Sequence, residues 1–253
     1  MQTRHGDLRV VGGFLLFPAV FPLVLAAFPL VLAAFPLVLA VFPPALGAQE
    51  MEEYAIDASA SEVYIVTHKE GLLSFLGHEH AIIPGTWEGR LCLEQPLSSL
   101  GPGSRGSLTI QTKSLVIDSD SARALAGLGS GPGAEDRREI QEKMLNADNL
   151  AAQRFPQIQL RMEALDSLQE GEIRVRVTLE VRAASRENEI PVTVEILDEG
   201  AVGFSGRMEA RQTDFGIEPE SVAGVVKVSD AVDLHFRLLG RSPGRAWGEN
   251  AAP

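Results

Sequence analysis

The residues with the clearest capacity for chemistry are three histidines in the first half of the chain, His68, His78 and His80. His78 and His80 lie two positions apart in the sequence GHEH, so in an extended strand their rings would share one face and Glu79 would occupy the other. Imidazoles side by side can bind a divalent metal, contact the polar headgroup of a ligand, or hydrogen-bond the backbone of a turn. His68 lies upstream, where a hairpin would bring it close enough to supply a third metal ligand. The sequence leaves these roles open.

Glu79 supports an alternative in which a bound metal activates water and this carboxylate acts as the general base. A histidine pair alone is a weak signal for a metal, because zinc sites usually show three or four ligands. The chain contains no nucleophile elbow, phosphate-binding P-loop or HExxH motif. We therefore expect no catalytic activity. A metal-binding protein or metallo-hydrolase built on His68, His78 and His80 is kept as the alternative.

Two polar residues near the end of the chain receive simpler roles. His235 falls on the polar face of its predicted strand, opposite Leu234 and Phe236, and we expect it to be solvated. Asp214 lies in the sequence TDFGI, where an Asp followed closely by Gly is typical of a turn. We expect Asp214 to stabilise that turn or to pair with Arg211.

The overall charge excludes one class of partner. The chain carries 22 Lys and Arg against 34 Asp and Glu, which gives a net charge of −12. Nucleic acids and anionic membrane surfaces are bound by clustered Lys and Arg, so we expect no nucleic-acid partner. Cys92 is the only cysteine, so neither an intrachain disulfide nor a thiolate metal cluster can form.

The first 48 residues are typical of an export or anchoring segment. Arg4 and Arg9 precede an apolar run from Val10 to Ala48 that contains no charged residue. We expect a signal peptide cleaved near Ala48, with an uncleaved N-terminal membrane anchor as the alternative. Either form predicts that residues 49–240 work outside the cytoplasm, in the periplasm or the extracellular space.

From Tyr54 onward, apolar and polar residues alternate with the period of a half-buried strand. The clearest example is 172–183, where the odd positions hold Ile, Val or Leu as far as position 181 and the even positions hold Glu, Arg or Thr. Similar segments are 62–69, 86–94, 107–113, 155–164, 189–197, 202–211 and 225–238. Strands that are apolar on one face belong to antiparallel sheets, and so many of them indicate a sandwich or a closed barrel.

One stretch interrupts this alternation. Residues 118–153 contain Ile140, Met144 and Leu145 at helical spacing, with acidic residues near the start of that run, so we expect a helical insertion between strands. The last residues, 241–253, are expected to form a disordered tail.

Several motifs, taken in order, resemble those of the YceI-like family of exported lipid- and polyisoprenoid-binding proteins. They are YAIDASASEVYIVTHK, LGHEHAIIPGTWEGRL, LNADNLAAQRFPQIQLRMEAL, VRVTLEVRA, RQTDFGI and VKVSDAVDLHFRL. The resemblance extends roughly from Tyr54 to Leu239, with GHEH as a GHxH-containing variant. It departs where many members carry Arg two residues before the Asp of the DFG-like segment. This chain has Gln212 there, preceded by Arg211.

The resemblance implies an antiparallel, lipocalin-like β-barrel whose apolar cavity holds an isoprenoid or quinone-like lipid. The residues then expected to contact the ligand are Phe75, His78, His80, Trp87, Phe155, Phe204, Arg211 and Phe215. The lipid is the expected partner and no cofactor is certain. A divalent metal, membrane attachment through the N-terminal segment and a homodimer stay open.

The width of the barrel leaves open a further alternative, in which the protein binds no ligand. The interior of an eight-stranded barrel is just wide enough either to be filled by its own side chains or to hold one small ligand. A barrel that is packed solid would instead indicate a structural domain of the cell envelope.

Overall fold

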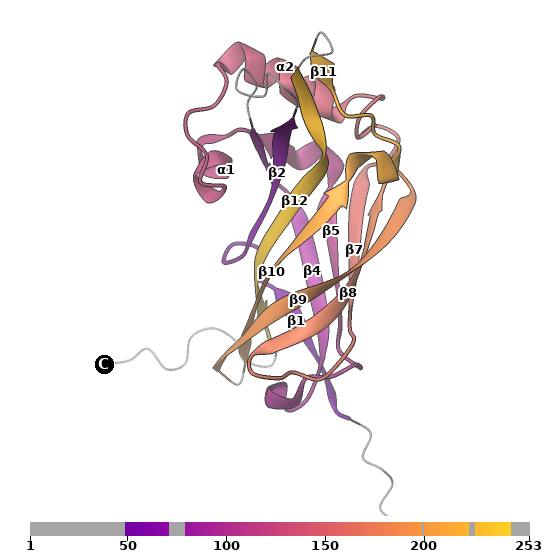
Figure 1. Cartoon of the computed structure of the whole chain (residues 1–253). Helices are drawn as coiled ribbons and strands as arrows, with labels where there is room; N and C mark the ends of the chain where they lie inside the picture. Colours follow the sequence, from indigo (N-terminus) through magenta and orange to yellow (C-terminus); the bar gives the residue numbers. More distant parts are fainter. Residues whose placement is uncertain (1–48, 71–78, 199, 223–225, 244–253) are drawn as a thin grey trace, which may run out of the picture. The chain divides into compact units, whose positions relative to one another are not determined.

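The computed structural model describes residues 49–70, 79–198, 200–222 and 226–243, and these form almost entirely β-structure (Figure 1). The predicted leader, 1–48, and most of the predicted tail lie outside the described residues. The strands are β1 (Met51–Ile56), β2 (Glu62–Glu70), β3 (His80–Pro84), β4 (Trp87–Glu94), β5 (Arg105–Gln111), β6 (Leu115–Ile117), β7 (Gln157–Ala164), β8 (Glu172–Val181), β9 (Ala184–Asp198), β10 (Ala201–Arg211), β11 (Ser221–Val222) and β12 (Val226–Arg241). No helix in these ranges is both long enough and apolar enough to cross a membrane.

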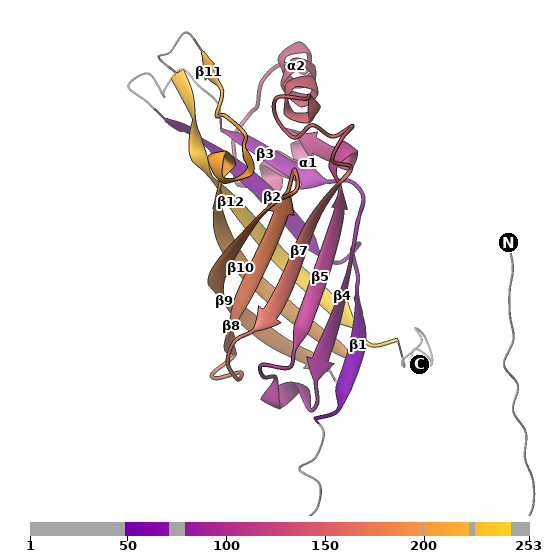
Figure 2. The same cartoon turned by 90° about the vertical axis from the view of Figure 1, so that its right-hand side faces the viewer.

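The described strands close into an eight-stranded antiparallel barrel, which confirms the predicted fold class. The order around the barrel is β1-β4-β5-β7-β8-β9-β10-β12, and β12 returns to β1 through the pairs Ala55–Arg241 and Ile56–Gly240. Next to this closure, the Asp57 N–H donates to the Leu239 carbonyl at 2.9 Å, and Arg241 Nε donates to Asp57 Oδ2 at 3.0 Å. Figure 2 shows the strands crossing the barrel at a steep tilt.

Three of the barrel strands are broken into two halves. β1 is continued by β2, β4 is preceded by β3, and β5 is continued by β6. The halves outside the closed barrel, β2, β3 and β6, add to β12 to form the ladder β12-β2-β3-β6. Two of the breaks touch, because the Gly85 N–H donates to the Ser114 carbonyl at 2.8 Å. A Cβ on Gly85 would lie 2.8 Å from that same oxygen, so this close approach of two backbones requires glycine.

The barrel interior is made by the alternation seen in the sequence. β8 buries Ile173, Val175, Val177, Leu179 and Val181 and leaves the intervening side chains at least partly exposed. The same pattern on β5 and β7 buries Leu108, Ile110, Ile158 and Leu160. Strands with one apolar face must turn it inward when the sheet closes.

The predicted helical insertion is confirmed as two helices, α1 (Asp120–Leu125) and α2 (Ala134–Leu145). The Ser119 hydroxyl caps α1 by accepting from the Ala122 N–H at 3.2 Å. Both helices lie toward the end of the barrel drawn at the top of Figure 1, which we call the helix end. Ile140 and Met144 pack against the core from α2.

Gln141 attaches α2 to a strand edge. Among the described strands, β6 pairs with β3 on one side, and on its other side the Gln141 amide takes the place of a neighbouring strand. The Ile117 N–H donates to Gln141 Oε1 at 2.9 Å, and Gln141 Nε2 donates to the Leu115 carbonyl at 2.7 Å. One side chain thus satisfies two backbone groups that would otherwise need water.

Replacing Gln141 with Leu keeps helix propensity and removes both hydrogen bonds. We expect the Ile117 amide to exchange with solvent at least about tenfold faster, because two lost bonds of about 1 kcal/mol each weaken local protection. Hydrogen exchange followed by NMR measures this rate. The control is Glu139→Gln on the same helix, whose side chain is 65% exposed. Unchanged Ile117 exchange in the Gln141 variant would contradict this role.

Candidate functional site

Three apolar cavities lie inside the part of the barrel that the structure describes. The helix-end cavity, of about 150 Å³, is lined by Ile65, Thr67, Ile82, Ile110, Leu115, Met144, Asn149, Leu150, Ile158, Leu160, Leu179, Val181, Ala210, Arg211, Gln212, Phe215, Ile217, Val232 and Leu234. A central cavity of about 20 Å³ and an opposite-end cavity of about 60 Å³ follow it. The described part of the barrel is therefore not packed solid.

Shared lining residues show that the cavities form one row. Ile110, Leu160 and Leu234 line both the helix-end and the central cavity. Met162, Val177, Phe236 and Leu238 line both the central and the opposite-end cavity. Each pair of neighbouring cavities is thus separated by a few apolar side chains. The row offers the outline of a narrow apolar channel.

Polar groups at the helix-end cavity are few. They belong to Thr67, Asn149, Arg211 and Gln212 in an otherwise apolar lining. Such a lining combines a large apolar surface with a small number of groups that can orient a ligand. Arg211 was expected to contact a ligand from the sequence, and the structure places it here.

The turn after β10 positions Arg211 and Phe215. A short 3₁₀ helix (Gln212–Phe215) buries the Phe215 ring, and Gly216 follows with φ +68°, a conformation that favours glycine. Asp230 holds this turn by accepting from the Thr213 N–H and hydroxyl at 2.9 and 2.7 Å. The hydrogen bond from the Thr213 N–H lowers the pKa of Asp230, with the hydroxyl adding to it.

Asp214 does not play the role expected of it. Neither a backbone group of the turn nor Arg211 is its partner in the described residues. Its carboxylate lies 3.4 Å from Arg186 Nε on β9. The turn chemistry belongs to Asp230, which is distant in sequence and reaches the turn from β12.

The predicted aromatic residues separate into two groups. Phe215 lines the helix-end cavity and Phe204 lines the opposite-end cavity. Trp87 packs against the core but lines none of the three cavities. Phe155 also lines none of them, because it precedes β7 and does not share that strand's alternation. Its ring lies 5.1 Å from the Arg154 guanidinium carbon, and Phe75 lies outside the described residues.

The structure does not bring His68 and His80 together. His80 pairs with Thr67 across β2 and β3, so His68, one residue further along, points to the opposite face of the sheet. His78 lies outside the described residues. No group of three His, Cys, Asp or Glu side chains able to hold a metal occurs in the part of the chain that the structure describes. His68 and His80 therefore cannot share one metal in this arrangement.

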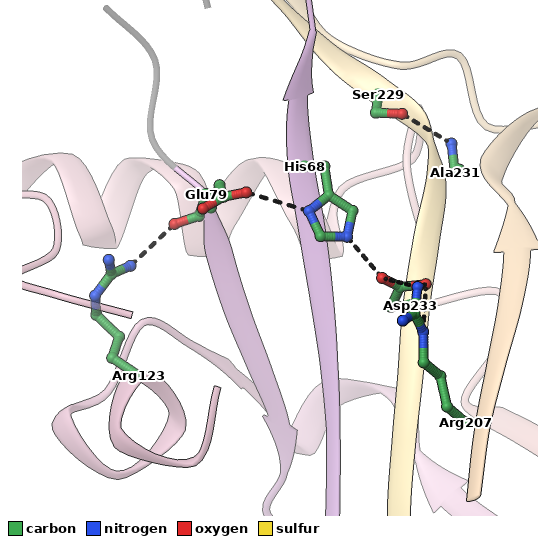
Figure 3. Close-up of polar contacts among 7 residues, drawn as sticks. All are labelled: His68, Glu79, Arg123, Arg207, Ser229, Ala231 and Asp233. Carbon is green, nitrogen blue, oxygen red and sulfur yellow. Dashed lines mark hydrogen bonds and ion pairs between the residues drawn. The ribbon is translucent and has the colours of Figure 1, made fainter. Parts of the chain in front are cut away.

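His68 belongs to a polar row on the outer face of the barrel (Figure 3). Its Nδ1 lies 3.2 Å from Glu79 Oε1, and its Nε2 lies 2.8 Å from Asp233 Oδ2. Arg207 Nη2 donates to both Asp233 oxygens at 2.9 Å. The row therefore connects β10, β12, β2 and the start of β3 by side-chain contacts.

The charges in this row shift two pKa values. The hydrogen bond to Asp233 raises the pKa of His68, and this outweighs the lowering caused by burial. Burial raises the pKa of Asp233, but the hydrogen bonds from His68 and Arg207 outweigh it and leave the pKa low. In the sequence, the alternation of the strand only puts Asp233 on the same polar face as His235. Nothing in its immediate sequence indicates that it would be buried between a histidine and an arginine.

His235 differs from the expectation of a solvated side chain. It stacks on Tyr64, with ring centroids 4.7 Å apart and planes within 4° of parallel. The two residues face each other across β2 and β12. Burial lowers the pKa of His235.

The comparisons with known proteins agree with this architecture. The family model described as YceI-like domain matches residues 54–239. No curated protein matches the chain. Among solved structures, BcnA of Burkholderia cenocepacia is 16% identical and has a TM-score of 0.53, covering 73% of this chain and 98% of that one. That likeness shows a shared fold.

Two further structures are less similar. A polyisoprenoid binding domain from Saccharophagus degradans, implicated in plant cell wall breakdown, is 15% identical with a TM-score of 0.49, over 75% of this chain and 98% of that chain. The YCEI protein of Campylobacter jejuni is 12% identical with a TM-score of 0.48, over 64% of this chain and 84% of that chain.

The raised pKa of His68 predicts a pH dependence of stability. The folded state binds the proton more tightly than the unfolded state, so the stabilisation is complete below the unfolded pKa of about 6.5 and is lost as pH rises through the folded pKa. His68→Gln removes this titration. We expect the difference in free energy of unfolding between the parent protein and His68→Gln to shrink as the pH rises from about 5.5 through the folded pKa of His68. The change should stay below about 1 kcal/mol because the ring is partly solvated.

His235→Gln provides a control of opposite sign. Because burial lowers the pKa of His235, its contribution is present above about pH 6.5 and is lost as pH falls through the folded pKa. Urea denaturation across the pH range measures both variants. The same trend in both variants, or none in His68→Gln, would rule out the proposed coupling of His68 to Asp233.

Proposed function

Since the chain belongs to the YceI-like domain family, we propose that it binds the apolar chain of an amphiphilic isoprenoid or quinone-like lipid inside its barrel and carries out no catalysis. The observation that carries this proposal is the row of three apolar cavities along the closed barrel. Burial of each methylene of a lipid tail contributes about 0.8 kcal/mol, so the tail supplies affinity without a strong polar contact.

The form of the interior favours a thin, flexible chain. Small-molecule pockets usually measure about 300–1,000 Å³, and each of these cavities is smaller than that range. A compact ligand would need a wide space in one place. A linear chain can extend from one cavity into the next if the side chains between the cavities change rotamer. Met162, at one of the two divisions, has an unbranched side chain that adapts readily to such changes.

The polar groups favour one orientation of the lipid. Arg211, Gln212 and Asn149 gather at the helix-end cavity, where Met144 of α2 also contributes to the lining. The headgroup then lies at this end and the tail extends toward the opposite-end cavity. Selectivity comes from the few polar groups and affinity comes from the tail.

The proposed location of the protein, outside the cytoplasm, follows from the predicted leader. The uncharged apolar run from Val10 to Ala48 supports export, and therefore a role in sequestering or carrying lipid in the periplasm or the extracellular space. The alternative of a metallo-hydrolase on His68, His78 and His80 has less support, because His68 and His80 lie on opposite faces of the sheet.

Filling the helix-end cavity should prevent lipid binding. Ala210 lines this cavity, so Ala210→Phe places a ring where the lipid chain would lie. We expect geranylgeraniol, a linear prenol, to bind the residues 49–253 form, and the variant to bind at least about tenfold more weakly, equivalent to about 1.4 kcal/mol. Native mass spectrometry detects the complex, and the ligand-induced rise in melting temperature measures affinity.

The matched control is Val116→Phe. Val116 is 40% exposed on β6, so the same added ring lies outside the barrel and binding should change less than about twofold. A parent protein that binds no prenol or quinone would contradict the proposed function. Equal binding by the parent and Ala210→Phe would place the lipid elsewhere.

A further inference from the structure

His80 lies on the cavity side of the sheet at the helix end. It is the first residue of β3 and pairs with Thr67 on β2. Paired residues present their side chains on the same face, as do residues two apart in one strand. Thr67 and Ile82 both line the helix-end cavity, so His80 leaves the sheet on the same face, next to residues of that lining. Its side chain is 15% exposed.

A buried carboxylate fixes the ring of His80. Nδ1 lies 2.6 Å from Asp118 Oδ2, and the Asp118 side chain is fully buried. The other carboxylate oxygen accepts from Arg123 Nη1 at 2.6 Å and from the Ala81 N–H at 3.1 Å. Burial raises the pKa of Asp118, but the hydrogen bonds from His80, Ala81 and Arg123 outweigh it and keep the carboxyl ionised.

The ionised carboxylate decides which nitrogen of His80 carries hydrogen. An ionised carboxylate only accepts hydrogen bonds, so Nδ1 must be the donor. In the neutral ring, Nε2 is then an acceptor. Among the described residues, Nε2 has no hydrogen-bond partner. In that neutral form, the lone pair of Nε2 is available on the cavity side of the sheet.

Arg123 makes this arrangement rigid. Besides Asp118, its guanidinium donates to the Glu79 carbonyl at 3.0 Å and to the Gly129 carbonyl at 2.7 Å. A buried ion pair contributes little to stability once desolvation is counted, yet it can fix an orientation. Here the pair ties the loop after α1 to the start of β3 and holds the imidazole in one tautomer.

We propose that His80 Nε2 accepts a hydrogen bond from a hydroxyl group at the head of the bound lipid. This inference rests on the proposed lipid-binding function and narrows the ligand to an alcohol or a phenol, such as a prenol or a quinol. An ether, a quinone or a hydrocarbon with the same chain lacks the O–H donor. Asp118 and Arg123 act as positioning residues for His80.

The test compares ligands that share a tail and differ in the head. Geranylgeraniol, its methyl ether and the corresponding hydrocarbon form one series, and a short-chain quinol and its quinone form a second pair. We expect the parent protein to prefer the hydroxyl form by about five- to tenfold in at least one series, the gain from one added hydrogen bond. The series that shows the preference identifies the source of the hydroxyl.

Two variants assign the preference to His80. His80→Leu should bind the alcohol and the ether equally while keeping its affinity for the hydrocarbon. His68→Gln replaces a histidine on the outer face of the same sheet and should keep the preference. If a variant does not fold, the parent protein still tests the proposal, because equal affinity for the hydroxyl ligand and its matched analogue would contradict it.

The outcomes separate this inference from the proposed function. Binding of the hydrocarbon with no preference for the hydroxyl would overturn the role of His80 and leave lipid binding intact. A preference that persists in His80→Leu would also overturn it. Failure of every ligand to bind would overturn the proposed function itself.

Discussion

Closure of the sheet between β1 and β12 is the constraint on which the rest of the structure depends. Two residue pairs next to Asp57 join these strands, and they turn an amphipathic sheet into a barrel with an inside and an outside. Eight strands fix the width of that inside. The side chains on the inner faces do not fill it completely, which leaves the row of cavities. Any ligand must therefore be narrow.

The strands and the helical insertion could be predicted because their signals are local. Alternation along β8 and helical spacing in α2 depend on neighbours within one element. The family resemblance added the barrel. Phe204 follows the inward alternation of β10 and Phe215 lies in the turn after it, and each lines a cavity. Arg211 also lines the helix-end cavity, although the alternation that turns Ala210 inward would put Arg211 on the outer face. Phe155 lies outside the described strands, so strand alternation does not predict its surroundings.

The placement of the histidines depends on the register between strands, which the sequence does not reveal. His68 and His80 flank the connection between β2 and β3, and a shift of one residue in that ladder would exchange the face of either histidine. The observed register puts His68 on the outer face with Asp233, whereas His80 faces inward and binds Asp118. Two histidines that look like one site in the sequence thus bind different carboxylates on opposite faces of the sheet.

The Gln141 contact links the helix-end cavity to the tendency of the protein to self-associate. A strand edge with unpaired backbone groups can pair with another chain and start aggregation. In the described residues, the Gln141 amide covers such an edge on β6, and the same helix contributes Met144 to the lining of the helix-end cavity. A movement of α2 that widened the cavity would uncover this edge. The same two hydrogen bonds therefore hold one wall of the cavity in place and keep the edge of β6 from pairing with another chain.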